Sequence, residues 1–381
     1  MHHLAAALQD VLDSSGNAAL ATVVRTSGSA PLDAGAAMLV TDSGDVIGSV
    51  SGGCVESAVY ESAQEVIAGR EARLEVYGFS DEVALGVGLT CGGSLEVFIE
   101  PVSIGSFPQL EDVLSDIRHG KSVAVATVIS HPDPGRIGEH MAIRPSGLDG
   151  NPIETRAQKH DSLIRDAQEL LSAGRNEVLE YSNLSDYGDL RQQVFVRSFT
   201  SPPRMLIFGA IDFATALSRI GRFLGYRVTV CDARPTFTTS KRFPDAHQVV
   251  VRWPDDYLIE EVDAGRIDER SAVCVLTHDS KFDVPVLERA LRYSEAGYIG
   301  AMGSHRTHQD RLRRLRDAGL ADYEISRLRS PIGLDLGGRS PEETAVSIVA
   351  EIIALHRGRS GKPLNTLLGP IHGEPTLMNA P

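Results

Sequence analysis

The chain has 381 residues, of which 42% are hydrophobic and 23% are charged, a composition typical of a globular protein with room for two or three domains. Its net charge of −14 argues against nucleic acid as a partner, because phosphate binding needs a positive surface. No apolar run approaches the roughly 18 residues of a membrane span, and four unclustered cysteines favour a reducing cytoplasm over a disulfide framework.

The most informative segment is a glycine-rich loop over 51–56, which reads Ser-Gly-Gly-Cys-Val-Glu. It follows a predicted strand over 45–50 and opens a predicted helix over 55–68. The two glycines allow positive φ or a close approach to a ligand, and the helix start offers unpaired amides and the positive end of its dipole. An anion is favoured there, so Cys54 is a candidate reactive thiol. We expect a small anion or soft-metal site, with Cys54 as its catalytic or metal-contacting group, formed by Ser51, Gly52, Gly53 and Cys54.

A second loop of similar chemistry precedes a predicted strand over 94–100. It contributes three further candidate binding residues, Cys91, Gly92 and Gly93. The alternative for both loops is a tight turn with a small packed thiol, because free cysteine is often buried as a hydrophobic residue. A zinc site is disfavoured, since the sequence has no C-x-x-C pair and no Cys/His cluster with ligand spacing.

Residues 18–100 and 122–198 resemble two degenerate copies of one unit. Ala-Thr-Val-Val at 21–24 recurs as Ala-Thr-Val-Ile at 126–129, and Val97-Phe98 recurs as Val-Phe at 194–195. Both segments read as strand, hairpin, helix, strand, strand. The second copy lacks both glycine–cysteine corners, so we expect a duplication in which the first copy kept the chemistry. Chance similarity between two α/β units is the alternative.

The last third alternates between apolar strands and amphipathic helices, a rhythm that predicts a parallel sheet of the Rossmann type. The predicted fold class is therefore α/β, with an N-terminal, duplicated α/β region and a C-terminal Rossmann-like domain. A Ser-Pro-Glu-Glu sequence at 340–343 predicts a capped final helix that runs to about His356 and stops near Gly358. The predicted divisions are an N-terminal domain (1–103), a second copy or middle segment (104–200), the Rossmann-like domain (201–358) and a tail (359–381).

The nucleotide loop expected of such a domain is incomplete. Gly209 stands at its first position, but Ile211 replaces the second glycine, which normally admits a pyrophosphate against the backbone. Asp212 at the helix start would repel phosphate. Asp232, at the end of the next strand, could bind a ribose or close the strand end as an ion pair with Arg234, and both interpretations stay open.

Other strand ends in this domain carry polar residues that could face a ligand crevice. The candidates for cofactor contact there are His278, Gly303 and Ser304. Helix capping and turn formation are the equally weighted alternative for these residues.

Several motifs resemble those of a known family. The segment 48–56 resembles the N-terminal signature of the XdhC/CoxI family, and 90–93 is similar to its second N-terminal motif. The segments 299–304, 330–337 and 341–346 look like parts of its C-terminal Rossmann-type domain. The resemblance covers roughly residues 1–103 and 203–357, and the motifs occur in the family's order.

The resemblance implies a cytoplasmic maturation factor, rather than a turnover enzyme, for molybdenum hydroxylases of the xanthine dehydrogenase or carbon monoxide dehydrogenase type. Such proteins bind the molybdenum cofactor (molybdopterin or its dinucleotide form), protect it during sulfuration by a cysteine desulfurase or sulfurase, and pass it to the apo-enzyme. It implies that Cys54 contacts molybdenum or its sulfur and that Gly52 and Gly53 supply amides, whereas Glu56 caps the helix start. A homodimer is expected.

Two other functions remain as alternatives. One is an NAD(P)-dependent oxidoreductase that uses the Rossmann-like half, with Cys54 as a redox or nucleophilic group. The other is a regulatory protein that senses a nucleotide without turning it over. The incomplete glycine loop and the lack of a Tyr-x-x-x-Lys pair argue against hydride transfer.

Overall fold

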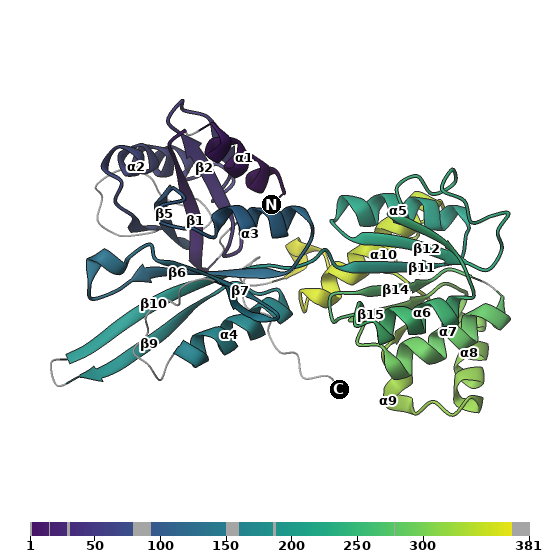
Figure 1. Ribbon diagram of the computed structural model, residues 1–381. Coiled ribbons are helices and arrows are strands. Elements are labelled where there is room, and N and C mark those ends of the chain that lie inside the picture. The colour runs from purple at the N-terminus through teal and green to yellow at the C-terminus, as the bar shows by residue number, and fades with distance from the viewer. Residues whose placement is uncertain are drawn as a thin grey trace. The chain divides into compact units, whose positions relative to one another are not determined.

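The protein is described by a computed structural model in which the chain divides into two compact units, Met1–Ser201 and Pro202–Leu367. Each unit has its own hydrophobic core, and both combine helices with sheets, which confirms the α/β fold class (Figure 1). No helix in the described part of the chain is long and apolar enough to cross a bilayer. The structure describes residues 2–14, 16–28, 31–78, 93–149, 160–185, 188–277 and 279–367.

The first half of the N-terminal unit is an antiparallel sheet of order β3-β2-β1-β5-β4. Along β1, alternate side chains face opposite sides of the sheet, and Ala19, Ala21 and Val23 face α2, which buries Val59 and Val66 against them. The elements are α1 (His2–Asp13), β1 (Ala18–Ser27), β2 (Ala37–Thr41), β3 (Val46–Gly48), α2 (Glu56–Gly69), β4 (Arg73–Tyr77) and β5 (Ser94–Val102).

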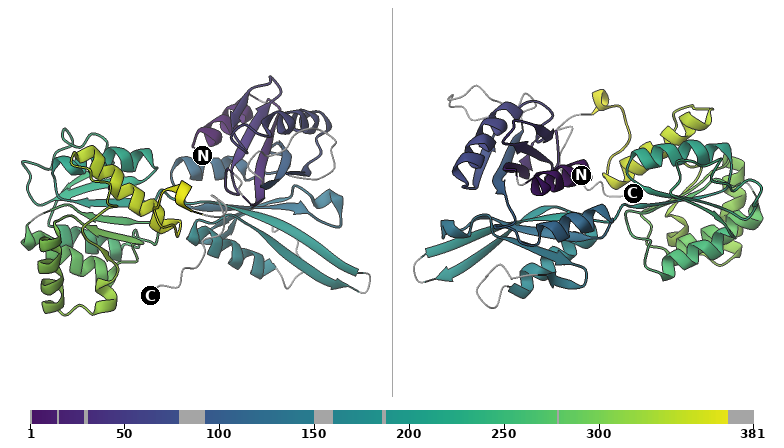
Figure 2. Two further views of the ribbon diagram at one scale, coloured as in Figure 1. Left: turned by 180° about the vertical axis from the view of Figure 1, so that it is seen from behind. Right: turned by 45° about the horizontal axis from the view of Figure 1, so that its top comes forward.

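The second half repeats this plan with the order β8-β7-β6-β10-β9, again antiparallel. Helix α4 covers one face of this sheet through Leu163, Ala167 and Leu170, as α2 does in the first half (Figure 2). The elements are α3 (Leu110–Arg118), β6 (Val123–Ser130), a 3₁₀ turn (Pro134–Arg136), β7 (His140–Arg144), β8 (Gly147–Asp149), α4 (His160–Ala173), β9 (Glu177–Ser185) and β10 (Gly188–Phe199).

The two halves agree in register as well as in strand order. Thr22 lies opposite Phe98 in the first sheet, and Thr127 lies opposite Phe195 in the second. Both sheets have a register shift at the equivalent place in their first strand. This is the topology that the predicted repeat requires, while descent of both halves from one ancestor stays a prediction.

The inner faces of the two sheets share a core with α1 and α3. Side chains from both sheets and both helices form one apolar cluster. A smaller cluster joins Val24 and Phe98 of the first half to their equivalents in the second, Ile129 and Phe195. The two halves are therefore packed into one unit by their inner faces, while α2 and α4 cover the outer ones.

The second unit is a six-stranded parallel sheet of order β13-β12-β11-β14-β15-β16, which confirms the Rossmann-like prediction. Two apolar clusters cover its two faces. The elements are β11 (Arg204–Phe208), α5 (Asp212–Phe223), β12 (Arg227–Asp232), β13 (Gln248–Val251), α6 (Pro254–Asp263), β14 (Ala272–Val275), α7 (Ser280–Tyr293), β15 (Tyr298–Ala301), α8 (His305–Asp317), α9 (Asp322–Ile325), β16 (Leu328–Arg329), α10 (Pro341–His356) and a 3₁₀ turn (Leu364–Thr366).

The predicted capping of the last helix is confirmed. The hydroxyl of Ser340 accepts a hydrogen bond from the amide of Glu343, whose carboxylate accepts one from the amide of Ser340. Helix α7 begins with a cap of its own, because the side chain of Asp279 accepts a hydrogen bond from the amide of Lys281.

Candidate functional site

The candidate loop joins β3 to α2. Its two adjacent glycines adopt positive φ, 76° at Gly52 and 122° at Gly53, as predicted. No atom lies within 4 Å of the place that a Cβ would take at either residue. The glycines therefore serve the backbone conformation of the loop, not tight packing around it.

The side chain of Glu56 folds back over this loop, and its carboxylate accepts hydrogen bonds from several of the loop's donors. Its Oε2 accepts from the amides of Gly53 (2.8 Å) and Val55 (3.2 Å), and its Oε1 accepts from the amide of Ser51 (2.9 Å) and the hydroxyl of Ser49 (2.6 Å). The hydroxyl of Ser51 donates to the same carboxylate. These bonds hold the loop before α2, and the helix itself has no side-chain cap hydrogen bond, so the cap predicted at the helix start is not formed.

The two serines complete the hydrogen bonding. The hydroxyl of Ser49 accepts from the amide of Gly52 at 2.9 Å. The buried hydroxyl of Ser51 accepts from the amides of Cys54 and Val55, at 3.0 and 3.1 Å. Each amide from Ser51 to Val55 thus donates to an acceptor within the chain, so the anion that this loop holds is the protein's own carboxylate. The expected amide contacts to a ligand would require Ser49 to leave the amide of Gly52 and Glu56 to leave the amide of Gly53.

The pKa of Glu56 reflects this arrangement. Partial burial acts to raise the pKa, but the hydrogen bonds from Ser49, Ser51 and the backbone outweigh burial and lower the pKa to about 2. Glu56 is therefore a carboxylate at every physiological pH. It places a fixed negative charge near Cys54, which stands two residues earlier in the chain.

Cys54 differs from the other described cysteines in its exposure. Its side chain is partly exposed and packs in part against the cluster under α2. Cys231 and Cys274 are buried in the sheet of the second unit, and burial raises the pKa of both thiols, to about 12 for Cys231. Of the cysteines in the described ranges, Cys54 is thus the one suited to contact a ligand.

The second predicted loop contributes less. Gly93 is buried directly before β5, whereas Cys91 and Gly92 lie outside the described residues. Among the residues that the structure describes, no three His, Cys, Asp or Glu side chains are grouped so that they could hold a metal ion.

In the second unit, the predicted candidates lie at the carboxyl ends of neighbouring parallel strands. Gly209 follows β11, Asp232 ends β12, and Gly303 and Ser304 follow β15. The structure therefore brings them to one edge of the sheet. His278, which would follow β14, lies outside the described residues.

At this edge Asp232 is engaged by the chain itself. One of its oxygens accepts from the amide and Nε of Arg234, and the other accepts from the Arg234 Nη2 and the amide of Ala210. The guanidinium of Arg242 donates to the carbonyl of Ala210 and pairs with Asp212. The ion-pair interpretation of Asp232 is what the structure shows, and the incomplete glycine loop is closed by further internal bonds.

Ser304 acts as a helix cap. Its hydroxyl accepts from the amide of Thr307 at 3.2 Å in the first turn of α8. A Cβ at Gly303 would lie 3.0 Å from the Cβ of Thr307. Capping and close packing therefore account for these two residues, and their predicted cofactor contacts stay predictions.

The N-terminal unit also holds a group of buried charges that no sequence motif marks: Glu100, His140 and Arg197. A signal was nevertheless available, because Val-Phe-Ile before Glu100 and Val-Phe-Val before Arg197 are equivalent apolar runs that each end in a charge. A charged residue that continues a buried strand is unusual unless it has a partner.

Two family models match the chain, in the order of its two units. The XdhC and CoxI family matches residues 11–78, and the XdhC Rossmann domain matches residues 205–352. The matched segments together exceed half of the chain. They include the loop with Cys54 and most of the parallel sheet.

Relatives match over nearly the whole chain. A probable xanthine dehydrogenase subunit of Bacillus subtilis (strain 168) is 29% identical over 91% of this chain and 95% of its own. The molybdenum cofactor insertion chaperone PaoD of Escherichia coli (strain K12) is 26% identical over 91% of this chain and 87% of its own. The crystal structure of a xanthine dehydrogenase from Bacillus halodurans has a TM-score of 0.68 and 29% identity, covering 93% of this chain and 96% of that one. With both of the family's domains present and in order, the chain belongs to the XdhC and CoxI family.

Proposed function

We propose that this protein binds the molybdenum cofactor and assists its insertion into a molybdenum hydroxylase of the xanthine dehydrogenase type. The observation that carries the proposal is the partly exposed Cys54 at the tip of a loop locked by Glu56. The name of the PaoD relative supports the cargo, and that of the Bacillus subtilis relative supports the client.

The chemistry of the loop decides which end of the cofactor approaches it. A thiolate is a soft ligand that suits molybdenum. The carboxylate of Glu56 repels phosphate and already occupies the amides that a phosphate would need. We therefore expect the metal end of the cofactor, and not its phosphate end, to lie against Cys54.

In this proposal Glu56, Ser49 and Ser51 position Cys54, and Cys54 makes the contact to the cargo. Holding the metal end in this way would protect it while a separate sulfurase exchanges an oxo ligand for sulfide, before the cofactor passes to the apo-enzyme. The partner sulfurase, the cytoplasmic location and a homodimer remain predictions that accompany this proposal.

The test is retention of the cofactor by the purified full-length protein. Wild-type protein mixed with molybdenum cofactor and then desalted should retain molybdenum and pterin in equal amounts, measured by metal analysis and pterin fluorescence. Cys54→Ser should lose most of both, while Cys231→Ala, in the buried sheet of the second unit, should retain them. No retention by the wild type would contradict the function, and full retention by Cys54→Ser would contradict the role of Cys54.

The NAD(P)-dependent oxidoreductase and the nucleotide sensor are not favoured by the geometry. The acceptor atoms of Asp232 are engaged by Arg234 and Ala210, and Ile211 stands where a pyrophosphate would need a glycine. Calorimetric titration with NADH and NADPH tests both alternatives.

A further inference from the structure

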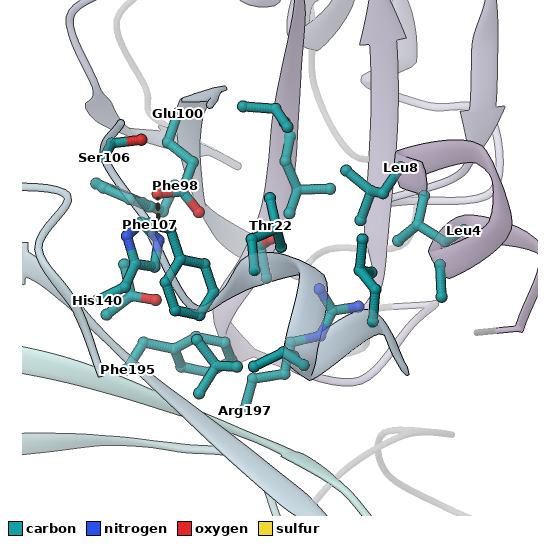
Figure 3. A pocket seen from close by; sticks show the side chains of 18 of the residues that line it. Leu4, Leu8, Thr22, Phe98, Glu100, Ser106, Phe107, His140, Phe195 and Arg197 are labelled. Carbon is teal, nitrogen blue, oxygen red and sulfur yellow. Dashed lines mark ion pairs between the residues drawn. The ribbon is translucent and has the colours of Figure 1, made fainter. Parts of the chain in front are cut away.

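The N-terminal unit encloses a cavity of about 90 Å³ between its two sheets and the helices α1 and α3 (Figure 3). Glu100 and His140 lie in its wall, where the Oε2 of Glu100 is 2.9 Å from the Nε2 of His140. Burial acts to lower the pKa of His140, but the charge of Glu100 and hydrogen bonding outweigh burial and raise it. Since a cavity of about 150 Å³ holds benzene, this smaller one suits a few water molecules rather than an organic ligand.

A different feature, on the second unit, is open to solvent: helix α10 has an apolar outer face. Its inner face packs into the core through Ile348 and Ile352. On the outer face Val346 and Ile353 are each 47% exposed, and Ala350 lies between them. Residues three and four apart share one side of a helix, so these three form a continuous row, here called the α10 stripe. In the left view of Figure 2, α10 (yellow) lies on the outside of the second unit.

The apolar surface continues from the α10 stripe onto the loop before the helix. Leu336 is 56% exposed, and together with Glu342, Val346 and two glycines it lines a hollow of about 300 Å³. The loop is held in place, because the carboxylate of Glu351 accepts a hydrogen bond of 2.9 Å from the amide of Gly333. A contiguous apolar surface on a fixed support is typical of a site that binds another protein.

The order of residues along α10 is self-complementary. Glu342 stands four residues before Val346, and Arg357 stands four residues after Ile353, so both charges lie on the side of the stripe. Two copies of α10 can pack antiparallel about a twofold axis near Ala350. Val346 of each copy then lies against Ile353 of the other, and Glu342 lies against Arg357. A parallel pair would instead bring Glu342 against Glu342, so the pattern favours the antiparallel pair.

The charges at the two ends set the orientation of this contact more than its strength. Glu342 and Arg357 are exposed, and Arg357 also has an interaction within its own chain. An exposed ion pair adds little to affinity, so the apolar residues must supply most of it. Ala350 is small and lies at the centre, which lets the two helices approach closely.

We propose that the protein forms a twofold-symmetric homodimer in which the α10 stripes of two copies pack antiparallel, with Leu336 of each copy at the edge of the contact. Because the row from Glu342 to Arg357 is about 22 Å long, the interface is small, and we expect a dissociation constant in the micromolar range. The contact lies on the second unit, whereas Cys54 lies in the first. The inference therefore goes beyond the proposed cofactor function and does not depend on it.

Analytical ultracentrifugation of the full-length protein tests the proposal. Wild type should change from monomer to dimer between about 1 and about 200 μM, a range that brackets a micromolar dissociation constant. Val346→Asp and Ile353→Asp should each stay monomeric, because each places a carboxylate in the apolar contact. The matched control is Val251→Asp, at a residue of β13 that is 46% exposed; it should dimerise like the wild type.

The outcomes decide what covers the α10 stripe. A wild type that stays monomeric throughout would overturn the homodimer and leave the stripe to the C-terminal segment 368–381 or to another protein. Dimerisation that is unchanged in both Val346→Asp and Ile353→Asp would overturn the location of the interface, as would its loss in Val251→Asp.

A cross-linking experiment tests the antiparallel arrangement separately. Ala350→Cys places a thiol close to the twofold axis, so mild oxidation should link two copies by a disulfide. Gln309→Cys, on the exposed side of α8, is the control and should give no more linked dimer than the wild type, which carries Cys54 as a background. No linkage through Ala350→Cys, or equal linkage through Gln309→Cys, would contradict the antiparallel pair.

Discussion

The carboxylate of Glu56 accepts a hydrogen bond of 2.8 Å from the backbone amide of Gly53, three residues before it. The same carboxylate accepts hydrogen bonds from Ser49, Ser51 and Val55. The loop resembles an anion site in sequence, and the anion that its donors bind is a side chain of the protein itself. The glycines, the serines and the glutamate thus act together to hold one conformation of the segment that carries Cys54.

Glu56→Gln should destabilise the protein by about 1 to 2 kcal/mol, because hydrogen bonds to a charged acceptor are replaced by weaker ones and the amide group meets donors. Urea unfolding measures the change. Glu65→Gln, in the exposed part of the same helix and paired with Arg73, is the control and should change stability by less than about 0.5 kcal/mol. Equal effects of the two substitutions would argue against a locking role for Glu56.

The same carboxylate predicts a response to acid. Because the pKa of Glu56 is lowered in the folded protein to about 2 from an ordinary 4.5, its stabilisation is present above pH 4.5 and is lost as the pH falls through 2. The stability difference between wild type and Glu56→Gln should therefore shrink over this window. A difference that is independent of pH there would contradict the lowered pKa.

Burial predicts which cysteines react. Alkylation of the native protein with iodoacetamide should modify Cys54 and leave Cys231 and Cys274 unmodified, because both are buried and burial raises the pKa of their thiols. Mass spectrometry of the digested protein identifies the sites. Labelling of Cys231 or Cys274 as fast as Cys54 would contradict their burial. It would show that the second unit unfolds locally or that its core is packed differently from the structure.

His140 should stabilise the protein most at low pH. Its raised pKa means that its stabilising effect is fully present below the ordinary value of 6.5 and is lost as the pH rises through the pKa of the folded state. The difference in melting temperature between wild type and His140→Gln should therefore be largest below pH 6.5 and decrease above it. A difference that grows with pH would contradict the Glu100–His140 pair.

Gly48, which ends β3, should tolerate substitution less well than Gly52. Its φ is 90°, and a Cβ there would lie 2.3 Å from the carbonyl oxygen of Ala37, whereas Gly52 has open space. Gly52→Ala should cost about 1 kcal/mol for its positive φ, and Gly48→Ala should cost more because the strand must also shift. Urea midpoints of the two variants give the comparison, and the reverse order would contradict the geometry of the turn.

Local signals in the sequence were sufficient for much of the fold. The Ser340–Glu343 capping box and the position of the loop before α2 follow from residues close in the chain, and the structure confirms both. The central strands β11, β14 and β15 are buried on both faces, which makes them recognisable without knowledge of their partners.

Pairing between residues that are distant in the chain could not be predicted from the sequence. The sequence identifies the glycine amides and Glu56 as separate features. It does not show that the carboxylate accepts hydrogen bonds from the loop amides, because this depends on how the side chain of Glu56 folds back. The pairing of Glu100 with His140 joins strands of different sheets. The opposition of Glu100 and Arg197 was open to prediction from the equivalent apolar runs before them, and the registers of the two halves establish it.

The difference in charge between Glu100 and Arg197, which occupy equivalent positions, has a consequence for how the two halves can diverge. In an assembly of two identical chains every substitution occurs twice, so matching positions across the axis must carry the same charge. The continuous backbone from β5 into α3 removes that requirement, and each half can change alone. An asymmetric arrangement of buried charges is therefore something that tethering two similar folds in one polypeptide makes accessible to selection.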